Sequence, residues 1–104
     1  MKRGQIWWAH HLGAASRRPV LILSRDAMPP GHGEITVAYL TSTIRNRPVE
    51  VFLTHADGVH KPCVVNLDAI NTIPKRYLKY FMCTLSAAKM DEVKEAILEA
   101  FDMK

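Results

Sequence analysis

The amino-acid sequence predicts a mostly β protein, a small and strongly bent sheet or barrel capped by one C-terminal helix. Two observations support this fold class. Short segments rich in β-branched and aromatic residues, separated by Gly, Pro, Asn and Asp, occupy residues 6–85. Beyond Ser86 the apolar residues change to helical spacing. Strands first and a single amphipathic helix last favour a sheet with that helix packed against it.

The size and composition indicate one domain. A chain of 104 residues is close to the usual domain size, and we assign residues 1–104 to a single unit. With 48% hydrophobic residues it can form a core without disulfides or metals. Cys63 and Cys83 both lie in apolar segments, which predicts buried, reduced thiols. No secretory leader and no run of about 18 apolar residues is visible, so we expect a cytoplasmic protein with no membrane segment.

The first strands begin close to the N-terminus. Residues 6–8 predict a strand in which Ile6 and Trp8 share one face. Residues 11–17 have the composition of a loop. Residues 20–23 are apolar on both faces, which is typical of a central strand. Pro19 is acceptable at the start of this strand because it has no N–H to donate to a neighbour.

Four more strands are predicted before the helix, with turn residues between them: residues 35–40, 48–53, 63–68 and 80–85. Alternation places Val49, Val51 and Leu53 on the core side of the 48–53 strand. Residues 72–75 predict a turn or a single helical turn.

The helix is predicted to run from an N-cap at Ser86 to about Phe101. Acidic side chains cover much of its surface, which predicts a solvent-exposed side. Its buried stripe is expected from apolar residues at near-helical spacing, namely Met90, Val93, Ile97 and Phe101.

The charge is unevenly distributed along the chain. Residues 1–80 hold 11 Lys and Arg against 5 Asp and Glu, whereas residues 81–104 hold 3 against 5. A basic body followed by an acidic helix suggests a polyanionic partner for the body. The net charge of +4 is also compatible with an ordinary soluble surface.

Arg18 and Thr41 are the most informative polar residues. Each lies at the end of a predicted apolar strand, so a guanidinium and a hydroxyl could hold one phosphate between them. The alternative for Arg18 is a strand-edge charge that discourages aggregation. The five histidines and two cysteines lack the spacing of zinc ligands, so we expect no metal and no cofactor.

Five segments in sequence order resemble the MazF/PemK toxins of prokaryotic toxin–antitoxin systems: residues 3–8, 18–22, 40–42, 64–73 and 85–97. The resemblance implies a small SH3-like barrel (PemK/CcdB-like) with a C-terminal α-helix, assembled as a homodimer. It implies a metal-independent, sequence-selective endoribonuclease that cleaves single-stranded RNA, often mRNA. The 2′-hydroxyl would attack, leaving a 2′,3′-cyclic phosphate. It also implies a cognate antitoxin whose acidic, disordered tail occupies the RNA groove.

By positional match, the resemblance puts the catalytic arginine at Arg18 and the catalytic threonine at Thr41. Arg18 would stabilise phosphorane charge and Thr41 would donate a hydrogen bond to a phosphoryl oxygen. The predicted substrate-binding residues are His10, Arg17, Ser42 and Asp68. Two departures from the family pattern are Gln5 in place of Asp, and His10-His11 in place of Asp-Leu.

Several residues have two readings. One of His10 and His11 could transfer a proton, but solvated loop residues are the preferred interpretation of both. Asp68 could accept a hydrogen bond from a base or hold a basic side chain in place. Trp7 or Trp8 could stack on a base or belong to the core. The remaining candidates for phosphate contacts are surface cations: Arg45, Arg47 and Lys61.

Two other functions compete with RNA cleavage. A toxin of the same fold could poison a protein target such as a topoisomerase, acting through its C-terminal residues. An inactive module could bind RNA or a partner without cleaving it, which Gln5 and the short loop before Arg18 leave open.

Overall fold

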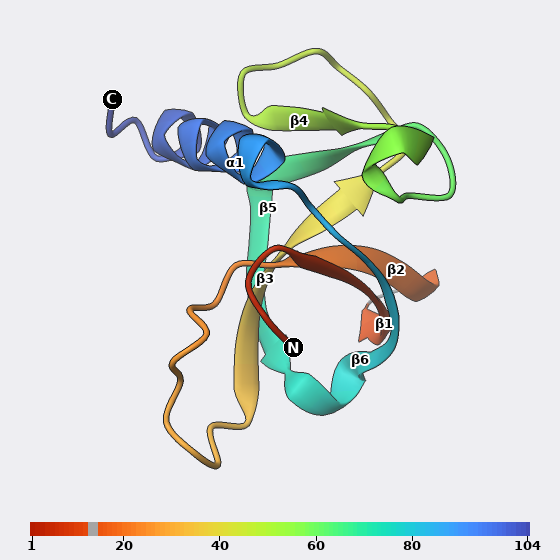
Figure 1. The fold of residues 1–104 in the computed structure, drawn as a ribbon, viewed down its shortest axis with the longest axis vertical. Helices are drawn as coiled ribbons and strands as arrows, with labels where there is room; N and C mark the ends of the chain where they lie inside the picture. Colours follow the sequence, from red (N-terminus) through yellow and green to blue (C-terminus); the bar gives the residue numbers. More distant parts are fainter. Residues whose placement is uncertain (13–14) are drawn as a thin grey trace.

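The computed structural model describes residues 1–12 and 15–104 and shows six strands in one antiparallel sheet, ordered β4-β5-β3-β2-β1-β6 (Figure 1). The sheet curls into a half-barrel, and the chain ends in a helix, which confirms the predicted fold class (Figure 1). The elements are β1 (Gln5–Leu12), β2 (Ala15–Ile22), β3 (Glu34–Thr41), β4 (Glu50–Leu53), η1 (His55–Asp57), β5 (Cys63–Pro74), η2 (Lys75–Tyr77), β6 (Leu78–Thr84) and α1 (Ala87–Ala100).

The β1–β2 hairpin is longer than the sequence predicted. Residues 11–17 were expected to form a loop, but β1 continues to Leu12 and β2 starts at Ala15, with His10 opposite Arg17. Backbone hydrogen bonds between β1 and β2 extend both strands beyond their apolar residues. The alternation of apolar residues indicates only the buried part of a strand, so the sequence pattern missed these extensions. Residues 13 and 14 lie outside the described part of the chain.

Strand β2 is central, as predicted. It lies between β3 and β1, and Val20, Leu21 and Ile22 are fully buried, on both faces of the sheet. Leu21 joins the cluster beneath α1, which also contains Val93, whereas Val20 and Ile22 join a second cluster with Ala9 and other residues. The stiff, doubly covered strand holds the residues at its N-terminal end in place.

Strand β5 corrects the prediction of a turn from residue 72. Thr72 pairs with Thr36, and their hydroxyls lie 2.8 Å apart, so the strand continues to Pro74 before η2 begins. The pairing with β3 shifts between Ala38 and Tyr39, which face Ile70 and Asn66 respectively. Residues 67–69 therefore bulge from this ladder, and such a bulge bends the strand and increases its twist.

Helix α1 packs over β4 and β5 (Figure 1). The Ser86 side chain accepts a hydrogen bond from Lys89 N at 3.2 Å, which confirms the predicted N-cap. Val93 is buried as expected, but the helix ends at Ala100, so Phe101 lies past its last turn and is 59% exposed. Ala96 takes a buried position that the predicted stripe omitted.

No helix in residues 1–12 and 15–104 is long and apolar enough to cross a membrane.

Candidate active site

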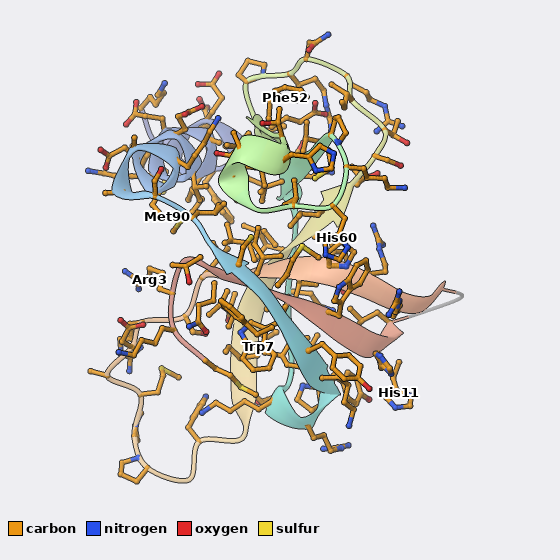
Figure 2. All side chains as sticks on the ribbon, turned by 45° about the vertical axis from the view of Figure 1, so that its right-hand side comes forward. Arg3, Trp7, His11, Phe52, His60 and Met90 are labelled. Carbon is orange, nitrogen blue, oxygen red and sulfur yellow. The ribbon has the colours of Figure 1, made fainter. Side chains whose placement is uncertain are left out.

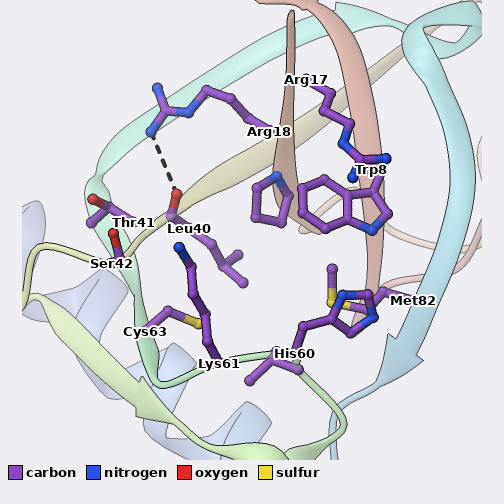
Figure 3. A pocket seen from close by; sticks show the side chains of 12 residues that line it. Trp8, Arg17, Arg18, Leu40, Thr41, Ser42, His60, Lys61, Cys63 and Met82 are labelled. Atoms are coloured by element: carbon purple, nitrogen blue, oxygen red, sulfur yellow. Dashed lines mark hydrogen bonds between the residues drawn. The ribbon is translucent and has the colours of Figure 1, made fainter. Parts of the chain in front are cut away.

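A cavity of about 410 Å³ opens beside the ends of β2 and β3 (Figure 3). Its walls come from β1, β2, β3, β6, the connection between β4 and β5, and the first residue of β5. The polar side chains on its lining are Arg17, Arg18, Thr41, Ser42, His60 and Lys61. Four of the six site residues that the sequence predicted therefore lie around one hollow.

Strand register explains why Arg18 and Thr41 meet. Val20 pairs with Tyr39 in the antiparallel ladder of β2 and β3. Continuing this register by two residues sets Arg18 across from Thr41, at the point where both strands leave the core. The register of the two strands thus brings two positions that are 23 residues apart in sequence to the same edge of the core.

The Arg18 guanidinium is held in place by two contacts. Its Nη2 donates a hydrogen bond to the Leu40 carbonyl oxygen at 3.4 Å, drawn as a dashed line in Figure 3. Its Cζ lies 4.8 Å from the centroid of the Tyr39 ring, which adds a cation–π contact. A guanidinium carries five N–H donors, so these contacts orient the group while leaving it able to donate to a phosphate.

The Thr41 and Ser42 hydroxyls lie on the same side of the cavity as Arg18 (Figure 3). Thr41 Oγ1 accepts a hydrogen bond from Thr43 N at 3.2 Å, which fixes the oxygen and leaves the hydroxyl proton for another acceptor. Ser42 follows directly and is exposed. A phosphoryl oxygen placed between Arg18 and Thr41 could accept from both.

Two further cations border the cavity. Arg17 lies on the β2 side, with its Cζ 4.4 Å from the centroid of the Trp8 ring. Lys61 reaches in from the connection between β4 and β5 (Figure 3). The lining includes three cationic side chains and no carboxylate among the described residues, so it favours an anionic ligand.

The connection between β4 and β5 supplies Lys61, a predicted candidate for phosphate contacts, together with two wall residues that were not predicted, Val59 and His60. After the short helix η1, Gly58 adopts φ 104° and turns the chain so that Val59 is buried and His60 and Lys61 border the cavity. The Asp-Gly pair predicts a turn here, but it does not predict which strands the turn will face.

The structure does not bring His10 and Asp68 to this cavity. Asp68 lies in the β5 bulge, is exposed, and pairs with Arg47 Nη1 at 3.5 Å, in line with the reading that it holds a basic side chain. His10 lies opposite Arg17, with its ring centroid 6.1 Å from that of Tyr80. Its buried Nε2 has no hydrogen-bond partner within residues 1–12 and 15–104.

Cys63 contributes an apolar surface to the cavity and no nucleophile. Burial, aided by the neighbouring Cys83 thiol, raises the pKa of the Cys63 thiol above its ordinary value of 9.0. A thiol with a raised pKa is neutral near pH 7, and the thiolate is the reactive form. Both cysteines are free; Cys63 is buried as predicted and Cys83 is half-buried.

Glu50 anchors the loop between β3 and β4 that carries Arg45 and Arg47. Its side chain is only 2% exposed and accepts hydrogen bonds from Arg45 N and Arg47 Nε, both at 3.0 Å. Burial raises the pKa of Glu50, but these hydrogen bonds and the charge of Arg47 outweigh burial and lower the pKa below 4.5. The carboxylate form is therefore the one that the folded loop stabilises.

We expect Glu50 to make stability depend on acid pH. Because its folded pKa is below the unfolded value of 4.5, its contribution is complete above that value and is lost as the pH falls through the folded pKa. Glu50→Gln should therefore lower the melting temperature at pH 7, and the difference from the wild type should shrink below pH 4.5. Thermal unfolding followed by circular dichroism between pH 7 and pH 3 measures it, and a gap constant across that range would contradict the assignment.

Within the described residues no group of three or more His, Cys, Asp or Glu side chains is arranged to hold a metal ion.

The fold and the cavity together define a small half-barrel protein with a cationic site between two strand ends. A model of the family described as PemK-like, MazF-like toxin of type II toxin–antitoxin system matches residues 2–101. The chain belongs to this family.

Individual relatives agree with the family assignment. The probable endoribonuclease MazF2 of Mycobacterium tuberculosis is 36% identical over 98 residues, covering 93% of this chain and 94% of that protein. The structure of M. tuberculosis toxin MazF-mt6 has a TM-score of 0.87 at 36% identity, covering 96% of this chain and 98% of that one. A mycobacterial endoribonuclease in complex with its cognate antitoxin has a TM-score of 0.88 at 27% identity, covering 100% and 97%.

Proposed function

We propose that this chain is a toxin that acts as a metal-independent, sequence-selective endoribonuclease on single-stranded RNA, mRNA included. The observation that carries the proposal is the meeting of Arg18 and Thr41 at one cationic cavity. The name of the 36% identical relative, probable endoribonuclease MazF2, supports the same activity for this chain.

The chemistry follows from what the two side chains can donate. The ribose 2′-oxygen attacks phosphorus, the bond to the 5′-oxygen of the next nucleotide breaks, and a 2′,3′-cyclic phosphate is left. Negative charge grows on the phosphoryl oxygens during this step, and Arg18 and Thr41 donate to them. The proton of the 2′-hydroxyl passes to a base and the leaving 5′-oxygen takes up a proton, so the reaction balances without a metal or oxidant.

We further propose that the chain works as a homodimer and is neutralised by an antitoxin. A relative of the same fold was solved with its cognate antitoxin, which supports such a partner here. An acidic antitoxin segment would bind to the cationic side chains around the cavity, Arg17, Arg18 and Lys61, and would compete with RNA for them.

We expect the purified protein to cleave a mixed-sequence RNA in the presence of EDTA. The 5′ fragments should end in a 2′,3′-cyclic phosphate, and a matched oligomer with 2′-deoxyribose at the cleaved position should stay intact because it lacks the nucleophile. Electrophoresis before and after acid treatment identifies the cyclic ends. Intact RNA with well-folded protein would overturn the proposal and favour a toxin that acts on a protein target or an inactive binding module.

A further inference from the structure

The cavity has two chemically different halves. Arg18, Thr41 and Ser42 form one side, and Trp8 and Met82 lie on the other (Figure 3). Val59, 4% exposed, adds to the apolar lining, and Cys63, 6% exposed, lies beside Ser42 (Figure 3). A phosphate needs the first half alone, because an anion gains nothing from an apolar wall.

We propose that the apolar half is a nucleobase subsite, in which the base next to the cleaved phosphate stacks on the indole ring of Trp8. The inference rests on the proposed ribonuclease function and assigns a ligand to the part of the cavity that phosphate chemistry leaves unused. The volume of about 410 Å³ lies within the usual range of small-molecule pockets, about 300–1,000 Å³. A nucleotide, with an anionic and a flat apolar part, matches both halves.

The surroundings of the two tryptophans distinguish their roles. Trp7 packs its ring edge-on against Phe81 at 5.9 Å, and its Nε1 donates to Gln5 Oε1 at 3.0 Å. It belongs to the second cluster and does not line the cavity. Trp8 points to the other face of β1 and lines the cavity, where the His60 ring lies 5.9 Å away. Trp8 is therefore the tryptophan that a ligand can reach.

The Arg17 contact shows that the Trp8 ring accepts a flat group. The guanidinium is planar, and its Cζ lies 4.4 Å from the indole centroid. A base that enters can replace Arg17 on the ring, and the released guanidinium is then available to the RNA backbone. The Cys63 thiol is neutral near pH 7, and the Met82 thioether is polarisable, so neither opposes an aromatic ligand.

The first test measures cleavage by variants of Trp8. Trp8→Leu should lower kcat/KM about 5- to 150-fold, which is the range that corresponds to one lost base stack. Trp8→Phe should retain most of the activity because it keeps a ring. Phe52→Leu is a matched control, since Phe52 is 47% exposed in β4 and does not line the cavity. Equal activity of Trp8→Leu and the wild type would overturn the subsite.

The second test measures binding apart from cleavage. Trp7→Phe leaves Trp8 as the only tryptophan of the chain. Its fluorescence should be quenched by a 2′-O-methyl RNA, which cannot be cleaved, and not by an abasic oligomer of equal length and charge. Equal quenching by both oligomers would overturn the subsite. Base-dependent quenching without cleavage by the wild type would keep the subsite and reject the ribonuclease function.

Discussion

Arg18→Ala is expected to lower the single-turnover rate of RNA cleavage about 10²- to 10³-fold. The Arg18 guanidinium lies at the border of the strand-end cavity, held by Leu40 O at 3.4 Å and by the Tyr39 ring. Alanine removes both the charge and the two-pronged donor that a phosphorane needs. The rate of cleavage of one mapped RNA oligomer, with protein in excess, measures the loss.

Two variants separate a catalytic role from a general effect of charge. Arg18→Lys keeps the charge and loses the planar donor pair, so we expect a rate between those of wild type and Arg18→Ala. Arg25→Ala removes an exposed arginine that does not line the cavity and should leave the rate unchanged. A melting temperature of Arg18→Ala close to the wild-type value would show that the fold is intact. Full activity of that variant would remove Arg18 from the mechanism.

Local sequence patterns predicted the strands and the helix well where the burial of apolar side chains determines the secondary structure. Three of the four residues of the doubly apolar segment 20–23 lie in the central strand β2, which ends at Ile22, and Ser86 is the N-cap of the helix. The errors occur where backbone pairing outweighs side-chain pattern. The ladder carries β1 to His11 and Leu12 although they are polar or only half-buried, and the bulge at 67–69 lets one strand run to Pro74. The alternation of apolar and polar residues within one segment does not reveal how that strand pairs with the strand beside it.

The site was predictable to the extent that it lies on strand ends. Arg18 precedes one apolar segment and Thr41 follows another, so the sequence placed both at an edge of the core, with Arg17 and Ser42 as their direct neighbours. His60 and Met82 could not be found in this way, because tertiary packing of the β4–β5 connection and β6 brings them to the cavity. Asp68 was predicted to bind substrate, but it lies in the bulge of β5 and pairs with Arg47 away from the cavity.

The β4–β5 connection, which carries His60 and Lys61, depends on Gly58 for two separate reasons. Gly58 has φ 104°, in the region that side chains with a Cβ rarely adopt. A Cβ built on it would lie 2.6 Å from Cys83 Cβ and 3.2 Å from Cys83 Sγ. Cys83 belongs to β6, which pairs with β1, so β6 cannot move away without breaking that pairing. The connection itself must shift.

Gly58→Ala is therefore expected to destabilise the protein by about 2–4 kcal/mol, combining backbone strain with overpacking. For a domain of about 100 residues this corresponds to a fall in melting temperature of roughly 10–25 °C. Thermal unfolding followed by circular dichroism measures it. The displaced connection should also slow cleavage, because His60 and Lys61 border the cavity.

Two other glycines separate the causes. Gly31 also has positive φ, 81°, but its Cβ would meet nothing within 4 Å, so Gly31→Ala carries the strain without the clash and should cost about 1–2 kcal/mol. Gly33 has open space and no positive φ, so Gly33→Ala should change stability by less than about 0.5 kcal/mol. If Gly58→Ala lowers the free energy of unfolding by no more than Gly31→Ala does, close packing against Cys83 does not position the wall of the cavity. A clear excess for Gly58→Ala, with slower cleavage confined to that variant, would show that close packing between Gly58 and β6 positions the cavity wall opposite Arg18.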